Sequence, residues 1–271
     1  MSRKPAGSER GWDTGSHQDF YRYYAAQSGG ASARERFMMI QSALLKAVGG
    51  GAEPLNVADV GCGAGTQCRL WAEHGHQVYG ADINYALIAL ARRRAAESGL
   101  DIAFDVASAT ALPWPDQSMD LCIVPELLEH VTDWRACIAE LVRVLRPGGA
   151  LYVSTTNRLC PLQEEYILPL YAWYPGWIKR HCEQLARSRF PRLAGFATYP
   201  AVNWFTFFML RDHLSTAHGM RSLDRFEMAD PGQHGVAGRW LLALARRVPL
   251  AHLCAHVATP YTVLLAFKPE A

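Results

Sequence analysis

The stretch VADVGCGAGTQ, residues 57–67, constrains the fold of this chain more than any other. Three glycines, Gly61, Gly63 and Gly65, alternate with small residues directly after an apolar run. Glycine loses more conformational entropy on folding than any other residue, so this turn indicates that something approaches the main chain closely. In an open parallel sheet, ligands bind beyond the carboxyl ends of the strands, where a turn of this kind lies.

Short apolar runs and longer amphipathic runs alternate along the rest of the chain. We predict strands at 55–61, 77–82, 102–107, 119–126, 150–157 and 260–269, with a further candidate at 221–230. Helices are predicted at 17–28, 32–50, 66–75, 84–99, 134–149, 206–220 and 236–257. Strands that alternate with helices of this length predict an α/β fold, with a parallel sheet covered on both faces.

Asp82 ends the second predicted strand, 82 − 61 = 21 residues after Gly61. An acidic residue about 20 residues beyond the glycine turn is placed to accept hydrogen bonds from ribose hydroxyls, which predicts a nucleoside ligand. A dinucleotide fingerprint requires Gly-x-Gly-x-x-Gly, but Thr66 stands at the third glycine position, which disfavours a nicotinamide-dependent oxidoreductase. A turn that serves packing alone is the remaining alternative.

The spacing Gly61-x-Gly63-x-Gly65 after Asp59 resembles motif I of the class I S-adenosylmethionine-dependent methyltransferases. The segments GADINYALIALARRRAAESGL, ELLEHV, LRPGG and STTNR resemble the branch of ubiquinone-biosynthesis O-methyltransferases, and the likeness covers roughly residues 34–158. The resemblance implies a doubly wound, Rossmann-like, seven-stranded, mostly parallel sheet with an antiparallel last strand, N-terminal helices and a cap insertion.

The resemblance also implies the cofactor S-adenosylmethionine, with S-adenosylhomocysteine as product. Asp82 would bind the ribose hydroxyls and Ile83 the adenine ring, while Arg36, with Arg34 as a rival, would bind the methionine carboxylate. Similar enzymes carry an aspartate for the adenine amino group where this chain has Ser108, and Asp105 is a candidate substitute. The full set implied for cofactor binding is Arg36, Gly61, Cys62, Gly63, Gly65, Asp82, Ile83, Ser108, Ala109 and Pro125.

His130 is the candidate catalytic base, because a hydroxyl acceptor requires a group that removes its proton. We expect Glu126 and His130 to lie four residues apart on one helical face, with Glu129 beside them. Three readings of His130 stay open: a base, a ligand of a divalent metal, and a helix-start residue satisfied by hydrogen bonds, with Glu129 exposed to solvent. A metal site is not expected, and the remaining histidines, among them His252 and His256, show no zinc spacing.

We expect residues 1–18 to be a disordered tail and residues 19–271 to be one methyltransferase domain. Within it, 19–52 would form N-terminal helices, 158–200 a cap insertion and 236–257 a helical insertion before the last strand. The aromatic residues Phe20, Tyr21, Tyr23 and Tyr24 suit either a lid over the pocket or core packing.

Charge and cysteine content bear on partners and location. The net charge of +2 gives no support for a nucleic-acid partner. Seven cysteines without a C-x-x-C pair favour reduced thiols and a cytoplasmic protein. The stretch 166–189 combines aromatics such as Trp173 and Trp177 with Lys179 and Arg180, which suits either a membrane interface on the cytoplasmic face or a packed cap.

The sequence therefore predicts a methyltransferase that modifies a hydroxyl, or a carbon, of a small apolar or lipid-like acceptor. Two alternatives remain: a methyltransferase fold kept as a binding or scaffold protein, and, less favoured, a nicotinamide-dependent oxidoreductase. The oligomeric state is not indicated by the sequence.

Overall fold

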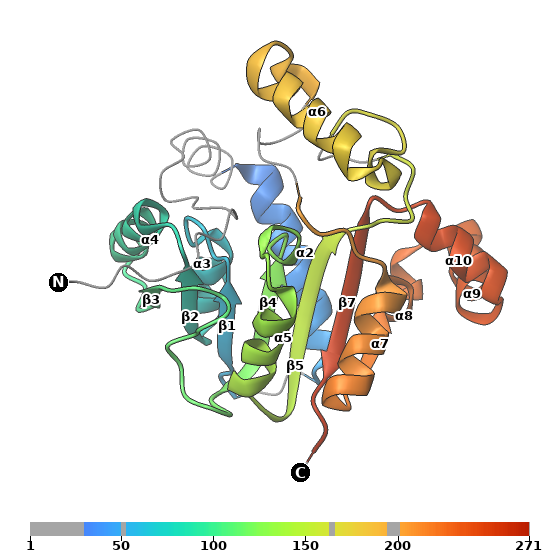
Figure 1. Cartoon of the computed structure of the whole chain (residues 1–271). Helices are drawn as coiled ribbons and strands as arrows, with labels where there is room; N and C mark the ends of the chain where they lie inside the picture. The colour runs from blue at the N-terminus through green and yellow to red at the C-terminus, as the bar shows by residue number, and fades with distance from the viewer. Residues whose placement is uncertain (1–29, 50–52, 163–165, 194–200, 271) are drawn as a thin grey trace.

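The computed structural model describes residues 30–49, 53–162, 166–193 and 201–270. Its centre is one seven-stranded sheet in the order β3-β2-β1-β4-β5-β7-β6 (Figure 1). The first five strands pair in parallel, and β7 pairs antiparallel with β5 and β6. The strands are β1 (Asn56–Val60), β2 (Gln77–Asp82), β3 (Ala103–Val106), β4 (Met119–Pro125), β5 (Leu145–Thr156), β6 (Arg221–Asp224) and β7 (Tyr261–Phe267).

Helices cover both faces of this sheet (Figure 1). The described α-helices are α2 (Ala31–Ala47), α3 (Thr66–Glu73), α4 (Tyr85–Glu97), α5 (Trp134–Val144), α6 (Gly176–Ser188), α7 (Phe207–His218), α8 (Arg225–Met228), α9 (Val236–Arg247) and α10 (Pro249–Val257). Short 3₁₀ turns are η2 (Leu128–His130), η3 (Tyr171–Trp173), η4 (Pro191–Leu193) and η5 (Pro231–Gln233).

Successive strand residues point into two separate cores, as the two-residue period of a strand requires. Val57 packs in the core under α2, α3 and α4, whereas its neighbour Ala58 packs in the core under α5 and α7. Leu121 and Cys122 of β4 divide in the same way. The continuous apolar runs of the sequence are therefore strands buried on both sides, and the predicted fold class is confirmed.

The predicted helix 134–149 is too long. The helix α5 ends at Val144, and Leu145 already pairs with Met119 as the first residue of β5. Pro147 cannot continue a helix, and its missing N–H is tolerated at the irregular start of a strand. The Nζ atom of Lys268 donates to the carbonyls of Val142 and Leu145, 2.7 and 2.6 Å away, and so satisfies the end of the helix.

Two further segments differ from the prediction. The helix expected at 236–257 is two helices, because Pro249 begins α10 and removes the N–H that continuous helical bonding needs. The candidate strand 221–230 is the short β6 followed by α8. Asp224 is the last residue of the strand and also caps the helix. Its side chain accepts from the nitrogens of Phe226 and Glu227, and the side chain of Glu227 accepts from the nitrogen of Asp224.

The segment after β5 lies beyond the carboxyl ends of the strands and includes α6 (Figure 1). It has a small core of its own, in which the rings of Tyr166 and Tyr171 stack with centroids 4.4 Å apart. The predicted boundaries of the cap and of the other subregions remain predictions. The tail 1–18, the helix 17–28 and the aromatic lid at 20–24 lie outside the described residues.

Among the described helices, none combines the length and the apolar character that crossing a bilayer requires. All seven cysteines lie in the described part of the chain, where each is a free thiol.

Candidate functional site

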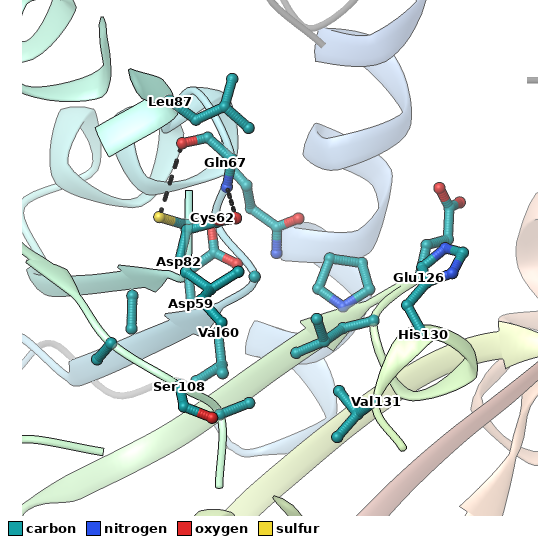
Figure 2. A pocket seen from close by; sticks show the side chains of 18 of the residues that line it. Asp59, Val60, Cys62, Gln67, Asp82, Leu87, Ser108, Glu126, His130 and Val131 are labelled. Atoms are coloured by element: carbon teal, nitrogen blue, oxygen red, sulfur yellow. Dashed lines mark hydrogen bonds between the residues drawn. The ribbon is translucent and has the colours of Figure 1, made fainter. Parts of the chain in front are cut away.

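A cavity of about 440 Å³ opens at the carboxyl ends of β1, β2 and β4 (Figure 2). From β1 the chain adds β2 and β3 on one side of the sheet, and then returns to add β4 and β5 on the other side. The cavity therefore lies at the switch point, between β1 and β4, where such sheets bind ligands. Its described lining residues all lie between Arg36 and Ala136. They include His130 and nine of the ten predicted cofactor residues: Arg36, Gly61, Cys62, Gly63, Asp82, Ile83, Ser108, Ala109 and Pro125.

The tenth predicted residue, Gly65, has a packing role instead. A Cβ atom on Gly65 would stand 2.9 Å from the ring of Phe104, and its φ of 73° is left-handed. Gly63 also has a left-handed φ, of 53°, but a Cβ there would meet open space, and Gly63 lines the cavity. The turn therefore uses its glycines for two purposes, close packing at one position and an accessible main chain at the other.

Asp82 fastens the end of β2 to this turn. Its Oδ2 accepts a hydrogen bond from the nitrogen of Gly63 at 3.0 Å, and its Oδ1 accepts one from the nitrogen of Asn84 at 2.7 Å. Burial raises the pKa of Asp82, and the two main-chain bonds oppose that rise. A carboxylate accepts about four hydrogen bonds, so Asp82 keeps acceptor capacity for a ligand in the cavity.

Asp59 and Gln67 also line the cavity, although the sequence prediction did not assign either side chain to it. Asp59 is buried; its Oδ2 accepts from the Cys68 thiol at 3.2 Å, and its Oδ1 bonds with no described residue. Gln67 is also buried, and neither atom of its amide bonds with a described residue. Buried polar groups normally have partners, so this pair indicates a polar ligand. In the sequence, Asp59 and Gln67 are polar residues on either side of the glycine turn, and this position is the signal that could have assigned them to the cavity.

Burial also raises the pKa of Asp59, to about 7, against an ordinary value of 3.8. The carboxyl group therefore carries a proton in part of the molecules near neutral pH. A ligand that brings a positive charge or a hydrogen-bond donor to Asp59 favours its ionised form.

Of the two rival arginines, Arg36 lies at the cavity and Arg34 does not. The Nη1 atom of Arg36 lies 2.6 Å from Oε1 of Glu126, and both residues line the cavity. Arg34 instead forms an ion pair of 2.6 Å with Glu73, and neither of these residues is among the described lining residues.

Ser108 lines the cavity at the position where similar enzymes carry an aspartate. Its hydroxyl lies 2.8 Å from Oγ1 of Thr110, which is also a lining residue. Asp105 does not replace the aspartate, because its Oδ2 accepts from Nε1 of Trp114 at 3.1 Å and it is not among the described lining residues. The cavity thus offers two hydroxyl groups at this point rather than a carboxylate.

The predicted helix through Glu126 and His130 is wrong. Glu126 has a φ of 54°, and only Leu128–His130 form a single 3₁₀ turn. The nitrogen of Glu126 donates to the carbonyl of Ser154 at 2.7 Å, which extends the pairing of β4 with β5 one residue beyond Pro125. A left-handed non-glycine residue at a cavity is a form of strain that occurs preferentially at functional sites.

His130 lies in the cavity wall after this turn (Figure 2). Burial lowers the pKa of its imidazole to about 4, so the ring is neutral at physiological pH. Glu129 next to it is not a solvated residue. It is fully buried, and its Oε2 accepts from Oγ1 of Thr155 at 2.7 Å. With Glu126 paired to Arg36 and Glu129 to Thr155, the metal reading of His130 has no support among the described residues.

The described residues fit S-adenosylmethionine. The helix α3 begins at Thr66 with no side-chain cap, so the partial positive charge of its N-terminus lies at the cavity wall. Asp59, Gln67 and Asp82 provide polar contacts, and Ile83 and Leu87 provide apolar ones. A nucleoside with an amino-acid arm needs both kinds of contact.

Comparison with known proteins shows a related family. Residues 58–153 match a family described as "Methyltransferase domain". The ubiquinone biosynthesis O-methyltransferase of Chelativorans sp. (strain BNC1) is 36% identical over 129 residues, which are 45% of this chain and 50% of that protein. The chain therefore spans about half the length of this relative.

Two solved structures share the fold. The PH0226 protein from Pyrococcus horikoshii OT3 has a TM-score of 0.57 at 17% identity, over 92% of this chain and 99% of that one. An S-adenosylmethionine-dependent methyltransferase from Mesorhizobium loti has a TM-score of 0.53 at 20% identity, over 83% of this chain and 96% of that one.

Proposed function

This chain belongs to the class I S-adenosylmethionine-dependent methyltransferase superfamily, and we propose that it methylates a hydroxyl, or a carbon, of a small apolar or lipid-like acceptor. One observation carries the proposal: a single cavity is lined by the glycine turn with Asp82 and also by His130. The candidate cofactor site and the candidate base therefore share one cavity.

The chain's own residues would hold the cofactor as follows. Asp82 accepts from the ribose hydroxyls, and Ile83 and Leu87 contact the adenine ring. Arg36 binds the methionine carboxylate. Gln67 supplies an amide whose donor and acceptor both lack a described protein partner. These contacts orient the ligand, and correct orientation accounts for much of the rate acceleration when the transferred group is already activated.

When bound, S-adenosylmethionine supplies a methyl group on a positively charged sulfur, which is a ready leaving group. His130 acts on the acceptor. Its neutral imidazole accepts the proton of a hydroxyl, which becomes strongly acidic as that oxygen is alkylated. A base with a pKa of about 4 is sufficient for such a proton. Burial of the ring keeps it neutral and available across the physiological pH range.

An apolar acceptor is supported by the wall around His130. Leu127, Val131 and Ala136 line the same cavity as His130, together with the polar residues Glu126, Thr132 and Asp133. A pocket with mostly apolar walls and few polar groups binds amphipathic small molecules. The relative from Chelativorans carries a name that assigns it to ubiquinone biosynthesis, which also supports a lipid-like hydroxyl acceptor.

The test is transfer of an isotope-labelled methyl group from S-adenosylmethionine to three acceptor classes: alkylated phenols and catechols, polynucleotides, and proteins. We expect labelled product with the first class only. Transfer only to polynucleotides or proteins would contradict the acceptor assignment. Cofactor binding without transfer to any class would favour a fold retained for binding.

We also propose contact with a membrane surface through the segment 166–189. Trp173 and Trp177 are 52% and 68% exposed, and Arg180, which is on α6 with Trp177, is also exposed. Lys179, expected on the same surface, is turned inward: its Nζ donates to the carbonyl of Ala172 at 3.0 Å. Exposed tryptophans beside a cation suit the interface between water and lipid.

A further inference from the structure

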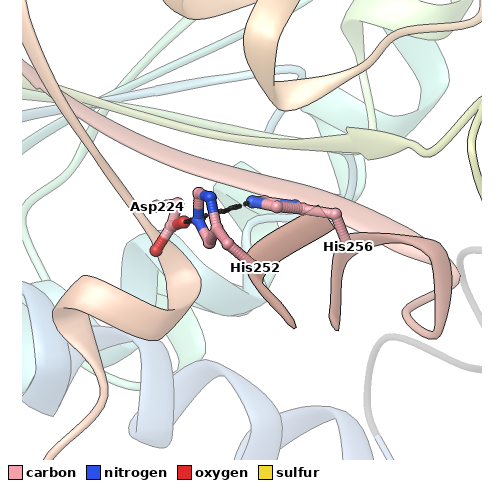
Figure 3. Close-up of side chains that lie close together, drawn as sticks. All are labelled: Asp224, His252 and His256. Atoms are coloured by element: carbon pink, nitrogen blue, oxygen red, sulfur yellow. Dashed lines mark hydrogen bonds and ion pairs between the residues drawn. The ribbon is translucent and has the colours of Figure 1, made fainter. Parts of the chain in front are cut away.

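Three side chains outside the cavity lie close together near β6, the strand at the antiparallel edge of the sheet. They are Asp224, at the junction of β6 and α8, and His252 and His256, both on α10 (Figure 3). The Nε2 of His256 lies 3.1 Å from Oδ2 of Asp224 and 3.2 Å from Nε2 of His252. The Nε2 of His252 also contacts Oδ2 of Asp224. None of the three is among the described lining residues of the cavity.

Hydrogen bonds alone cannot explain all three of these close contacts. A carboxylate oxygen only accepts, and each imidazole Nε2 either donates one proton or accepts one. If both Nε2 atoms donate to Oδ2, two N–H groups face each other across 3.2 Å. If one Nε2 donates to the other, the accepting nitrogen presents a lone pair to the carboxylate. At most two of the three contacts are hydrogen bonds, whereas one cation satisfies all three lone pairs at once.

We propose that Asp224, His252 and His256 bind a divalent transition-metal ion, zinc in the first instance. Two imidazole nitrogens and one carboxylate oxygen are ligands that zinc commonly takes. Ligand atoms at usual zinc distances in a tetrahedral arrangement lie about 3.3 Å from one another. The contacts of 3.1 and 3.2 Å between Nε2 of His256 and its two partners match that spacing, whereas Nε2 of His252 and Oδ2 of Asp224 lie closer together. Magnesium and calcium prefer sites made of oxygen atoms.

The surroundings hold the ligand atoms in place. The Oδ1 of Asp224 accepts from the nitrogens of Phe226 and Glu227, both at 2.8 Å, which leaves Oδ2 directed at the histidines. The ring of His256 stacks on Phe207, with centroids 5.2 Å apart and planes within 11°. Partners that orient the ligands are a regular feature of protein metal sites.

The site has both a buried and an accessible side. Asp224 and His256 are buried, while the side chain of His252 is 26% exposed. Three protein ligands leave a fourth position for water, and the exposed side of His252 gives the ion a route in. His252 and His256 lie 28 and 32 residues from Asp224 in sequence. The ion would therefore fasten α10, and through it the pair α9 and α10, to the end of β6.

The test uses the full chain without an affinity tag that binds metal, stripped with a chelator and then titrated with zinc. We expect one zinc per chain and a rise in the melting temperature. Asp224→Asn, which keeps the helix cap, and His252→Gln should each lower zinc affinity by more than about tenfold. The matched control is His213→Gln with His218→Gln, because these α7 rings also lie close together, 5.7 Å apart, and should leave binding unchanged.

Cobalt substitution and X-ray absorption spectroscopy of the zinc-loaded wild type test the ligand set without any variant. We expect the visible bands of four-coordinate cobalt and a shell of nitrogen and oxygen atoms. Sulfur in that shell would place the metal on a thiol such as the exposed Cys254, and would overturn the proposal. Absence of zinc uptake by the wild type, or unchanged affinity in folded His252→Gln, would overturn it equally.

Discussion

The carboxylate of Asp82 accepts a hydrogen bond of 3.0 Å from the main-chain nitrogen of Gly63. This bond joins the end of β2 to the turn that follows β1, so the acidic residue and the accessible main chain form one structure. The open space beside Gly63 then has a clear purpose, because a ligand held by Asp82 must pass close to that turn.

Replacing Arg36 tests the assignment of the methionine carboxylate. Arg36→Ala should weaken S-adenosylmethionine binding by about 10- to 100-fold, because a charge-assisted hydrogen bond contributes about 1.5–3 kcal/mol. Calorimetric titration measures the change. Arg34→Ala is the control, since its partner Glu73 is not among the described lining residues and an exposed ion pair contributes little. Equal losses in the two variants would contradict the assignment.

Replacing His130 tests the base. His130→Asn should slow transfer to a hydroxyl acceptor by about 10²–10⁴-fold while cofactor affinity is kept. The control is His74→Asn, because His74 is exposed and not among the described lining residues. Turnover that survives in His130→Asn would leave His130 a structural residue.

The pH dependence of turnover follows from the lowered pKa of His130. The base is active while neutral, so its contribution is present above about pH 4 and is lost as the pH falls through that value. We therefore expect no step from His130 in the rate between about pH 6 and pH 8, where an ordinary histidine titrates. A step in that range that disappears in His130→Asn would show that the pKa is not lowered.

Asp59 should make the stability of the ligand-free protein depend on pH. Its folded-state pKa of about 7 exceeds the ordinary 3.8, so the folded state binds more protons than the unfolded state between these values. Stability from this group is therefore highest at the acidic end and falls as the pH rises towards 7.

Asp59→Asn tests this directly by urea unfolding. The variant should gain stability relative to wild type as the pH rises from about 4 to about 8, by up to about 1.4 kcal/mol for each unit of pKa shift. Asp105→Asn is the control carboxylate, on the neighbouring part of the sheet. A constant difference between Asp59→Asn and wild type across this range would contradict the raised pKa.

The membrane proposal predicts that the protein co-sediments with anionic vesicles at low salt and less so as salt rises, because salt screens the attraction. Trp173→Ser with Trp177→Ser should reduce that binding and leave cofactor affinity unchanged. Trp240→Ser is an informative companion, because Trp240 is 74% exposed on α9 and reports on a separate surface. Wild-type protein that stays in the supernatant at low salt would show that the segment 166–189 does not meet lipid.

Much of the fold was predictable because its signals are local. The apolar runs have the length of strands, and the glycine turn followed by Asp82 marks the switch point. The same signals placed Gly63 and Asp82 at the cavity. Gly65 is not among the described lining residues, and only the position of Phe104 on β3 shows that packing requires a glycine there.

The remaining features depend on contacts between distant segments. The helix expected at Glu126 is prevented by its bond to Ser154 on β5, which no local pattern reveals. Glu129 looked solvated because its partner, Thr155, lies on the same distant strand. The four-residue spacing of His252 and His256 was visible, but their third partner depends on where β6 ends.

The central claim is that the cavity binds S-adenosylmethionine through Asp82, and calorimetric titration of wild type, Asp82→Ala and Asp105→Ala tests it most directly. The account predicts binding by wild type and by Asp105→Ala. It predicts a loss in Asp82→Ala of about 1.5–3 kcal/mol for each bond removed, with the fold retained by circular dichroism. Absence of binding by wild type, or equal affinity in a folded Asp82→Ala variant, would contradict it.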